Sequence, residues 1–266
     1  MSASGVSRRS PRSKTRSSLA VNAANDTGAI RKAKPQVRAV LARFLRSAGT
    51  NLAHDAATAY RRLRKDDADT VAAIVDQLGF QDWDSLSDSL KQHLIAVYQE
   101  SGAEAVAAVL DRPLVAELFG ALNQPAADYA TARGAELVTQ ITDATRDGLR
   151  GLIEDAFTDG MSPADLAASI RGSYLFSPER ADLIAQTELG MAHVSGTLEG
   201  WKQSGVVEGK SLILSNDHDQ DDECNDAADL GVVPLDSDFD GLGDPPIHPR
   251  CECDVIPQVV AADEAD

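Results

Sequence analysis

Apolar side chains recur every three or four residues between about residues 28 and 203, which is the spacing of one face of an α-helix. The first such segment carries them at Val37, Val40, Leu41, Phe44 and Leu45. Further helices are predicted over residues 69–78, 84–109 and 114–122. Pro113 and Gln124-Pro125 are expected to separate helices, because proline lacks the amide hydrogen and disfavours helix at the preceding residue.

The same period continues in a long helix predicted over residues 125–158, which we expect to stop at Asp159-Gly160. Ser162-Pro163-Ala164-Asp165 is a typical helix start, with an N-cap hydroxyl, a proline in the first turn and a carboxylate three residues after the cap. A last long helix is predicted from Pro178 to about residue 203, ending at Ser204-Gly205.

The pattern changes after residue 205. Short apolar runs at residues 206–214, 231–235 and 253–256 predict strands joined by acid-rich and Gly/Pro-rich loops. The predicted fold class is therefore mainly α with a small C-terminal α+β module. We divide the chain into a disordered basic arm (1–27), a helical region (28–123), the C-terminal module (124–257) and an acidic tail (258–266).

Charge is divided unevenly between the two ends. The 266 residues include 42 acids and 25 bases, a net charge of −17, yet residues 1–50 hold eleven bases and one acid. The last 66 residues hold three bases and seventeen acids. This asymmetry predicts an oriented molecule with a basic arm and an acidic module.

The basic arm has the composition of a chain that does not fold alone, because it has almost no large apolar side chains. Its cations are expected to bind nucleic acid by neutralising phosphates, with a solvated leader as the alternative. The five candidate nucleic-acid contacts are Arg8, Arg9, Arg12, Lys14 and Arg16.

Membrane insertion is not expected. The longest apolar runs, such as residues 105–110, are far shorter than the roughly 18 to 20 residues that cross a bilayer. Ser7-Arg8-Arg9-Ser10 is similar to a twin-arginine signal, but no apolar signal core of roughly 7–15 residues follows it. Three cysteines, two of them at 251 and 253, favour a reducing compartment over a disulfide scaffold.

The C-terminal module carries a candidate metal site. Three thiols and one imidazole are the ligand set of a closed structural zinc site, which can stabilise a region with a small core. The alternative is that the thiols pack as small apolar groups and the imidazole caps a turn. The candidate zinc ligands are Cys224, His248, Cys251 and Cys253.

A second candidate cation site is a calcium loop. Acids at relative positions 1, 3, 5 and 9 and a glycine at position 6 match part of an EF-hand loop, but position 12 is Ile247 instead of glutamate. Solvated acidic loops are the alternative. The four candidate Ca²⁺ or Mg²⁺ ligands are Asp236, Asp238, Asp240 and Asp244.

No catalytic motif is present at a recognisable spacing, so we predict that the protein is not an enzyme. His54, His93 and His193 lie in predicted helices without evident partners. Glu188 is the best isolated acid, yet a lone carboxylate on an apolar stripe is usually a member of an ion pair. Arg180, eight residues earlier, is an available partner if a third residue bridges the two.

Between about residues 138 and 257 the chain resembles the phage Mu F-like domain, the minor head or head morphogenesis protein family of tailed phages and prophages. An ordered series of segments carries the resemblance: Arg180-Ala181-Asp182-Leu183-Ile184-Ala185-Gln186-Thr187-Glu188, Gly200-Trp201-Lys202-Gln203-Ser204-Gly205-Val206-Val207, Cys224, Val233-Pro234-Leu235 and His248-Pro249-Arg250-Cys251-Glu252-Cys253. In this series Arg180, Thr187 and Glu188 are the motif residues of the predicted last long helix.

The resemblance implies a structural protein of the phage head, present in few copies inside the capsid near the portal and needed for head assembly or DNA packaging. Its implied partners are the portal protein, the major capsid protein and packaged DNA. The chain departs from the family at Gln186, where arginine is usual, and at Ala227, where the second cysteine of a Cys-x-x-Cys pair is usual. The alternatives are a metal-binding adaptor without a viral role and a Mu F-like module with an unrecognised enzymatic activity.

Overall fold

The computed structural model is mainly helical, with a small C-terminal sheet of three antiparallel strands, as the sequence predicts. The structure describes residues 27–63, 68–80, 83–110, 116–216, 218 and 222–259, with the side chains of residues 63, 68, 69 and 116–122 excepted. The helices are α1 (Gly28–Leu63), α2 (Ala68–Asp76), α3 (Asp84–Leu110), α4 (Ala116–Thr158), α5 (Pro163–Gly172), the 3₁₀ turn η2 (Tyr174–Phe176), α6 (Pro178–Ser204) and α7 (Glu223–Asp229).

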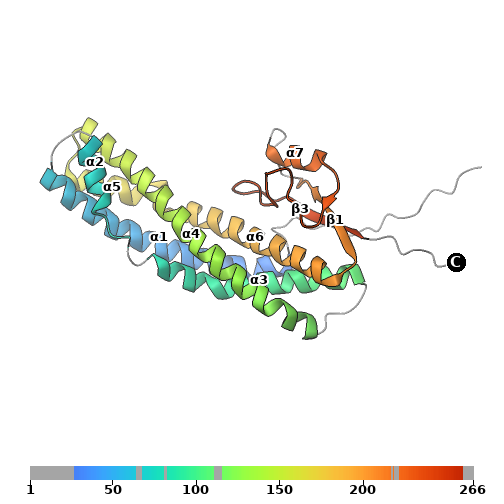
Figure 1. The fold of residues 1–266 in the computed structure, drawn as a ribbon. Helices are drawn as coiled ribbons and strands as arrows, with labels where there is room; N and C mark the ends of the chain where they lie inside the picture. Colours follow the sequence, from blue (N-terminus) through green and yellow to red (C-terminus); the bar gives the residue numbers. More distant parts are fainter. Residues whose placement is uncertain are drawn as a thin grey trace, which may run out of the picture.

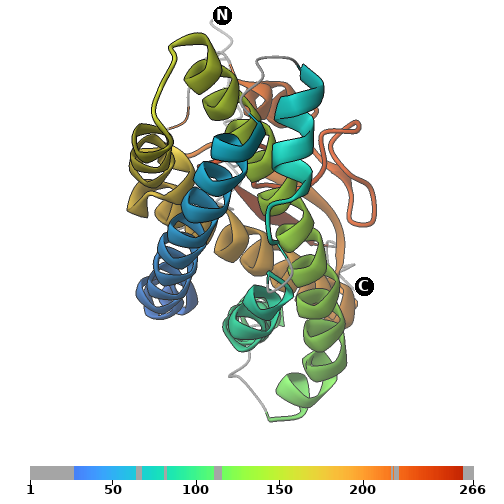
Figure 2. The same ribbon diagram turned by 90° about the vertical axis from the view of Figure 1, so that its left-hand side faces the viewer.

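Four long helices, α1, α3, α4 and α6, form an elongated bundle (Figure 1). The short helices α2 and α5 lie at one end of the bundle, and the view turned by 90° shows the long helices side by side (Figure 2). One continuous apolar core joins residues of α1 to α6, including Leu41, Leu90, Leu149 and Leu189. The amphipathic stripes predicted from the sequence therefore meet in a shared interior.

Helix α4 corrects the predicted break at Gln124-Pro125, because it runs without interruption from Ala116 to Thr158 through Pro125. A proline inside a helix costs about 3 kcal/mol through a lost hydrogen bond and a steric clash. Ala126 next to it is fully buried beside Tyr98 and Ala103 of α3, so packing on α3 offsets this cost. The expected boundary between residues 123 and 124 lies within this helix.

The start of α5 agrees with the sequence in detail. The Ser162 hydroxyl accepts a hydrogen bond from the Asp165 amide at 3.1 Å, and the Asp165 carboxylate accepts one from the Ser162 amide at 3.3 Å. This reciprocal capping box satisfies two amides that a helix start leaves without partners. Helix α6 ends where predicted, at Gly205 in the left-handed conformation (φ 69°).

From here on, the module means the part of the chain after α6, residues 206–259. It contains the strands β1 (Val207–Ile213), β2 (Val233–Pro234) and β3 (Asp254–Val259), in the order β2-β1-β3. The helix α7 lies between β1 and β2, in a region that the sequence predicted as loop. The module core also includes Val194, Leu198 and Trp201 of α6, so the module packs directly on the bundle.

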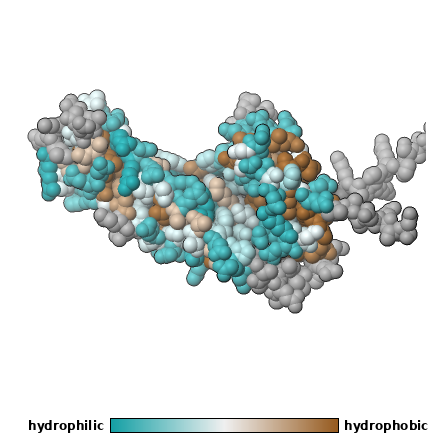
Figure 3. All heavy atoms as spheres, viewed as in Figure 1, coloured by the Kyte–Doolittle hydropathy of each residue, from teal (hydrophilic) through white to brown (hydrophobic). Residues whose placement is uncertain are grey.

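The surface is largely polar over the helices, and apolar residues gather on the visible face of the module (Figure 3). Leu230 and Val232, which flank Gly231, and Val259 at the end of β3 are among the large apolar side chains that stay exposed in the described residues. Within that part of the chain, we find no helix with the length and apolar content needed to span a bilayer.

Candidate functional site

The three cysteines converge in the core of the module. Cys224 lies in the first turn of α7, and Cys251 and Cys253 lie just before β3; all three are buried. The Sγ atoms of Cys224 and Cys251 are 3.5 Å apart, and the three Sγ atoms all lie within 4.8 Å of one another. Tetrahedral zinc with Zn–S bonds of about 2.3 Å would separate thiolates by about 3.8 Å, so this cluster is close enough to hold a metal ion.

His248 lies beside this cysteine cluster. Its Nε2, an Asp222 carboxylate oxygen and the Cys224 sulfur lie within 4.8 Å of one another. His248 Nε2 lies 3.1 Å from Asp222 Oδ2, but the two atoms are not aligned for a hydrogen bond. Neither atom forms a hydrogen bond with any other described residue. His248 Nδ1 lies 3.0 Å from the Pro249 carbonyl oxygen, the contact that in metal-binding histidines orients the ring and leaves the other nitrogen for the ion.

The thiols are also electrostatically linked. Hydrogen bonding from Cys253 is the main cause that lowers the pKa of Cys251 to about 5, whereas burial raises the pKa of Cys224 to about 12. The same hydrogen bond between Cys251 and Cys253 has the opposite effect on Cys253, because it raises the pKa of that thiol. The backbone amide of Ser215 donates to Cys253 Sγ at 3.5 Å. Zinc is bound by thiolates, so a bound ion would favour the deprotonated form of these sulfurs.

The structure does not bring the four aspartates of the candidate calcium loop together. Asp236 Oδ1 lies 2.8 Å from Lys202 Nζ, and Asp244 Oδ1 lies 2.6 Å from Nζ of the buried Lys210. Asp238 accepts a hydrogen bond from the Gly241 amide at 3.1 Å, and Asp240 has a positive φ of 52°. Two of the four carboxylates therefore form ion pairs with lysines, and the loop is held by turn geometry.

Glu188 belongs to an ion pair, as expected, but its partner is Arg133 and not Arg180. Glu188 is 2% exposed and forms two charged hydrogen bonds with Arg133 of α4: Nε donates to Oε2 at 2.7 Å and Nη2 to Oε1 at 2.6 Å. Burial raises the pKa of the Glu188 carboxyl, although the bonds from Arg133 oppose this shift. Sequence reasoning missed Arg133 because it lies 55 residues away on another helix.

Arg180 instead binds only neutral oxygen atoms. Its Nη1 donates to the Thr145 hydroxyl at 3.0 Å and to the Leu175 carbonyl at 2.8 Å, and its Nη2 donates to the Ile141 carbonyl at 3.5 Å. Arg180 is 7% exposed, and burial lowers the pKa of its guanidinium. The Thr187 hydroxyl donates to the Leu183 carbonyl one turn earlier in α6, at 3.0 Å.

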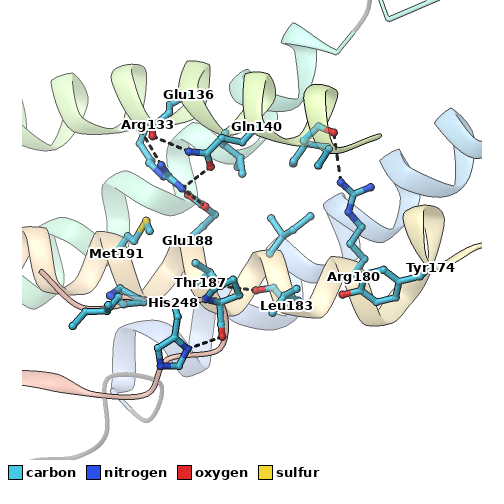
Figure 4. Close-up of a pocket in the computed structure, with 17 residues that line it drawn as sticks. Arg133, Glu136, Gln140, Tyr174, Arg180, Leu183, Thr187, Glu188, Met191 and His248 are labelled. Carbon is cyan, nitrogen blue, oxygen red and sulfur yellow. Dashed lines mark hydrogen bonds and ion pairs between the residues drawn. The ribbon is translucent and has the colours of Figure 1, made fainter. Parts of the chain in front are cut away.

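All three motif residues, Arg180, Thr187 and Glu188, line one pocket of about 430 Å³ between α4 and α6 (Figure 4). Residues 246–249, which lead to Cys251, form its other wall, so His248 lines the same pocket. We call this the α4–α6 pocket. Arg180 and His248, which are 68 positions apart in the sequence, thus line one pocket next to the cysteine cluster.

A buried polar chain links the module to the bundle. His193 Nδ1 of α6 lies 2.8 Å from the Ser101 hydroxyl of α3, and His193 Nε2 lies 3.2 Å from Asp254 Oδ2 of β3. The residue types are those of a hydrolase triad, but Ser101 is 2% exposed and His193 7%, so a substrate has no access to the hydroxyl. We interpret this chain as a structural link. The expectation that His193 has no evident partner is wrong.

Some predicted features cannot be placed. The candidate DNA contacts Arg8, Arg9, Arg12, Lys14 and Arg16 lie outside the described residues, as do residues 260–266 of the acidic tail. Comparison with known proteins found no family model, no curated protein and no solved structure that matches the chain.

Proposed function

We propose that this chain is a minor head protein of a tailed phage or prophage, which acts by binding during head morphogenesis and DNA packaging near the portal. The observation that carries the proposal is the series of Mu F-like motifs from residue 180 to residue 253. Its two ends support the proposal further by lying together: Arg180, Thr187 and Glu188 face the segment that contains His248 across one pocket.

The proposal includes a structural zinc ion in the module. Cys224, Cys251, Cys253 and His248 would hold it, with Asp222 as a further ligand or as the partner of His248. A bound zinc ion supplies a fixed positive centre that links α7 to the segment before β3, in a module whose own core is small. This chain's residues orient the ligands: the Asp222 side chain caps α7 at Cys224, and the Ser215 amide donates to Cys253.

Elemental analysis of protein purified without chelators tests the zinc site. We expect about one zinc per chain. Cys251→Ser should lose most of the zinc. Asp236→Asn, which changes an aspartate of the acidic loop that pairs with Lys202, should keep the zinc. Wild-type protein without zinc would contradict the metal site and would leave the head-protein proposal intact.

Docking on a protein partner is the proposed way of acting. Leu230 and Val232 of the module are 43% and 56% exposed, and a protein interface would remove both apolar side chains from water. Light scattering of this chain mixed with the portal protein from the same genome should detect a complex. Val232→Glu should weaken the complex, whereas Tyr174→Glu, at a similarly exposed apolar residue outside the module, should not.

The basic arm is the proposed DNA contact, and its test is the salt dependence of DNA affinity. If the five cations between residues 8 and 16 all contact phosphates, removing residues 1–27 should reduce the slope of log K against log salt by about 4 to 5. An unchanged slope would contradict a role of the arm.

The second candidate is a metal-binding adaptor without a viral role, and the convergence of the three cysteine sulfurs is the observation that favours it. Neighbouring genes discriminate the two. Portal and capsid genes beside this one would support the head protein, and their absence would favour the adaptor.

A further inference from the structure

The α4–α6 pocket has the size and composition of a small-molecule site. Its volume of about 430 Å³ falls within the range of roughly 300–1,000 Å³ that is typical of ligand pockets. Aliphatic side chains from all three walls line it: Leu137 and Ile141 of α4, Leu183, Ile184 and Met191 of α6, and Ile247 of the loop. An apolar chain would replace water along this stretch.

One end of the pocket is positively charged. The Arg180 guanidinium lines it, and no carboxylate lies within ion-pair distance of Arg180 in the part of the chain that the structure describes. A buried cation costs free energy unless a counter-ion compensates it. Its three protein partners are neutral oxygens of Thr145, Leu175 and Ile141, so its charge is solvated but not neutralised.

At the other end, the guanidinium of Arg133 already has carboxylate partners among the described residues. There Arg133 is bound by Glu188 through two hydrogen bonds and by Glu136 at 2.8 Å, so its charge is already compensated. Figure 4 shows the two ends on either side of Leu183 and Thr187, with Arg180 next to Tyr174 and away from Arg133. A ligand with one anionic group would therefore bind in one orientation.

We propose that the α4–α6 pocket binds a small ligand made of an apolar chain that ends in a carboxylate, with the carboxylate at Arg180. The guanidinium keeps donors that its three protein bonds do not use, and carboxylates are the anions that its planar geometry matches best. The aliphatic side chains contact the apolar chain of the ligand, and Arg180 favours an anionic end group over a cationic one. This site is independent of the proposed role in the phage head.

Octanoate is the probe for this site, with octylammonium as the control of equal chain length and opposite charge. Calorimetric titration of the full chain should give saturable binding of octanoate with one site. Octylammonium should bind at least about tenfold more weakly, the factor that corresponds to about 1.4 kcal/mol. Arg180→Gln should remove this preference, whereas Arg150→Gln, at an exposed arginine of α4 outside the pocket, should keep it.

A second pair of variants covers the case in which Arg180→Gln does not fold. Ala144 lines the pocket and is exposed, so Ala144→Trp should block it without altering the bonds of Arg180. Ala135→Trp places the same side chain on an exposed position of α4 outside the pocket and should bind octanoate normally. Equal binding of the two probes, normal octanoate binding by Ala144→Trp, or no binding by wild type up to about 10 mM would each overturn the proposal.

Discussion

At the scale of single residues, the molecule is organised by charged side chains that it buries. Glu188 with Arg133, Arg180, and Lys210 with Asp244 all lie in or beside the core, where an unpaired charge is costly. Each of them joins elements that are distant in the sequence: α4 to α6, and β1 to the loop before the cysteines. Their contribution is therefore to fix one arrangement of the elements around the pocket and the cysteine cluster.

The buried ion pair gives a prediction. Glu188→Gln should lower the free energy of unfolding by about 2–4 kcal/mol, because Arg133 loses its buried counter-ion and keeps only the exposed Glu136. Glu100→Gln, which breaks the exposed pair with Lys32, should cost less than about 1 kcal/mol. Urea unfolding measures both changes.

The double variant separates charge from packing. Arg133→Met with Glu188→Leu should recover most of the lost stability, since it removes both buried charges and keeps apolar volume. A double variant that is less stable than either single variant would contradict this account of the pair.

Some residues of the candidate sites could be identified from the sequence, and others could not. The candidate zinc ligands could be found because cysteine and histidine are rare here and their chemistry is specific, and the structure brings the three thiols together with His248 beside Cys224. Arg133 could not be found, because an arginine in an exposed-looking stretch of helix carries no sign of the acid that it meets 55 residues later. The calcium pattern failed to converge because lysines from β1 and α6 take two of its carboxylates.

At the scale of elements, the closest contact that we can identify from glycines is the crossing of α3 and α6. A Cβ atom at Gly196 would collide with the Tyr98 carbonyl oxygen, and one at Gly200 with the Gly102 carbonyl oxygen. The backbones of the two helices therefore touch, which places Ser101 and His193 in hydrogen-bonding distance beneath the module.

Replacing glycine with alanine should have opposite effects on stability at this crossing and at an uncrowded position of α4. Gly196→Ala should destabilise the protein by about 2 kcal/mol or more, because overpacking forces the helices apart. Gly151→Ala, in the interior of α4 with open space around it, should stabilise by about 0.5–1 kcal/mol through helix propensity. Thermal unfolding of the two variants provides the comparison, and a stabilising Gly196→Ala would contradict the close crossing.

Helix prediction succeeded where one signal dominated and failed where two competed. The capping box at Ser162 and the glycine at position 205 are local signals, and the structure confirms both helix ends that they predict. At Pro125 the local signal favoured a break, but the packing of Ala126 against α3 prevailed. Helix α7 was missed because its seven residues are mostly acidic and small, and its formation depends on the Asp222 cap and on Cys224 in the module core.

A zinc ion bound as proposed should stabilise the module more than the bundle. Its core holds thirteen buried residues, three of them the cysteines, whereas the bundle core is much larger. Under the proposed zinc site, chelation should raise amide hydrogen exchange in α7 and β1–β3, while the exchange in the bundle around Leu90 and Leu149 stays slow. Equal exchange in the module with and without chelator would contradict a structural metal.

At the scale of the whole molecule, the basic start of α1 lies at the same end of the bundle as the acidic module: Lys34 Nζ donates to Gln186 at 3.4 Å, and Gln186 donates to Glu252 of the module at 2.9 Å. The basic arm leads into α1, whose residues 28–54 contain six bases and no acid, and the acidic module lies near the other chain terminus. The start of α1 and the module are therefore joined through Gln186 of α6, within one end of the bundle. Such a molecule can hold DNA through one part and a protein through another, which is the behaviour that we propose for it near the portal.

The presence of the protein in the virion tests the central claim most directly. Quantitative mass spectrometry of purified particles, induced from a host that carries the intact gene, should detect the chain in few copies per head, together with the portal and major capsid proteins. Particles that contain the portal and capsid proteins but not this chain, from cells in which the chain is made, would contradict the proposal that it is a minor head protein.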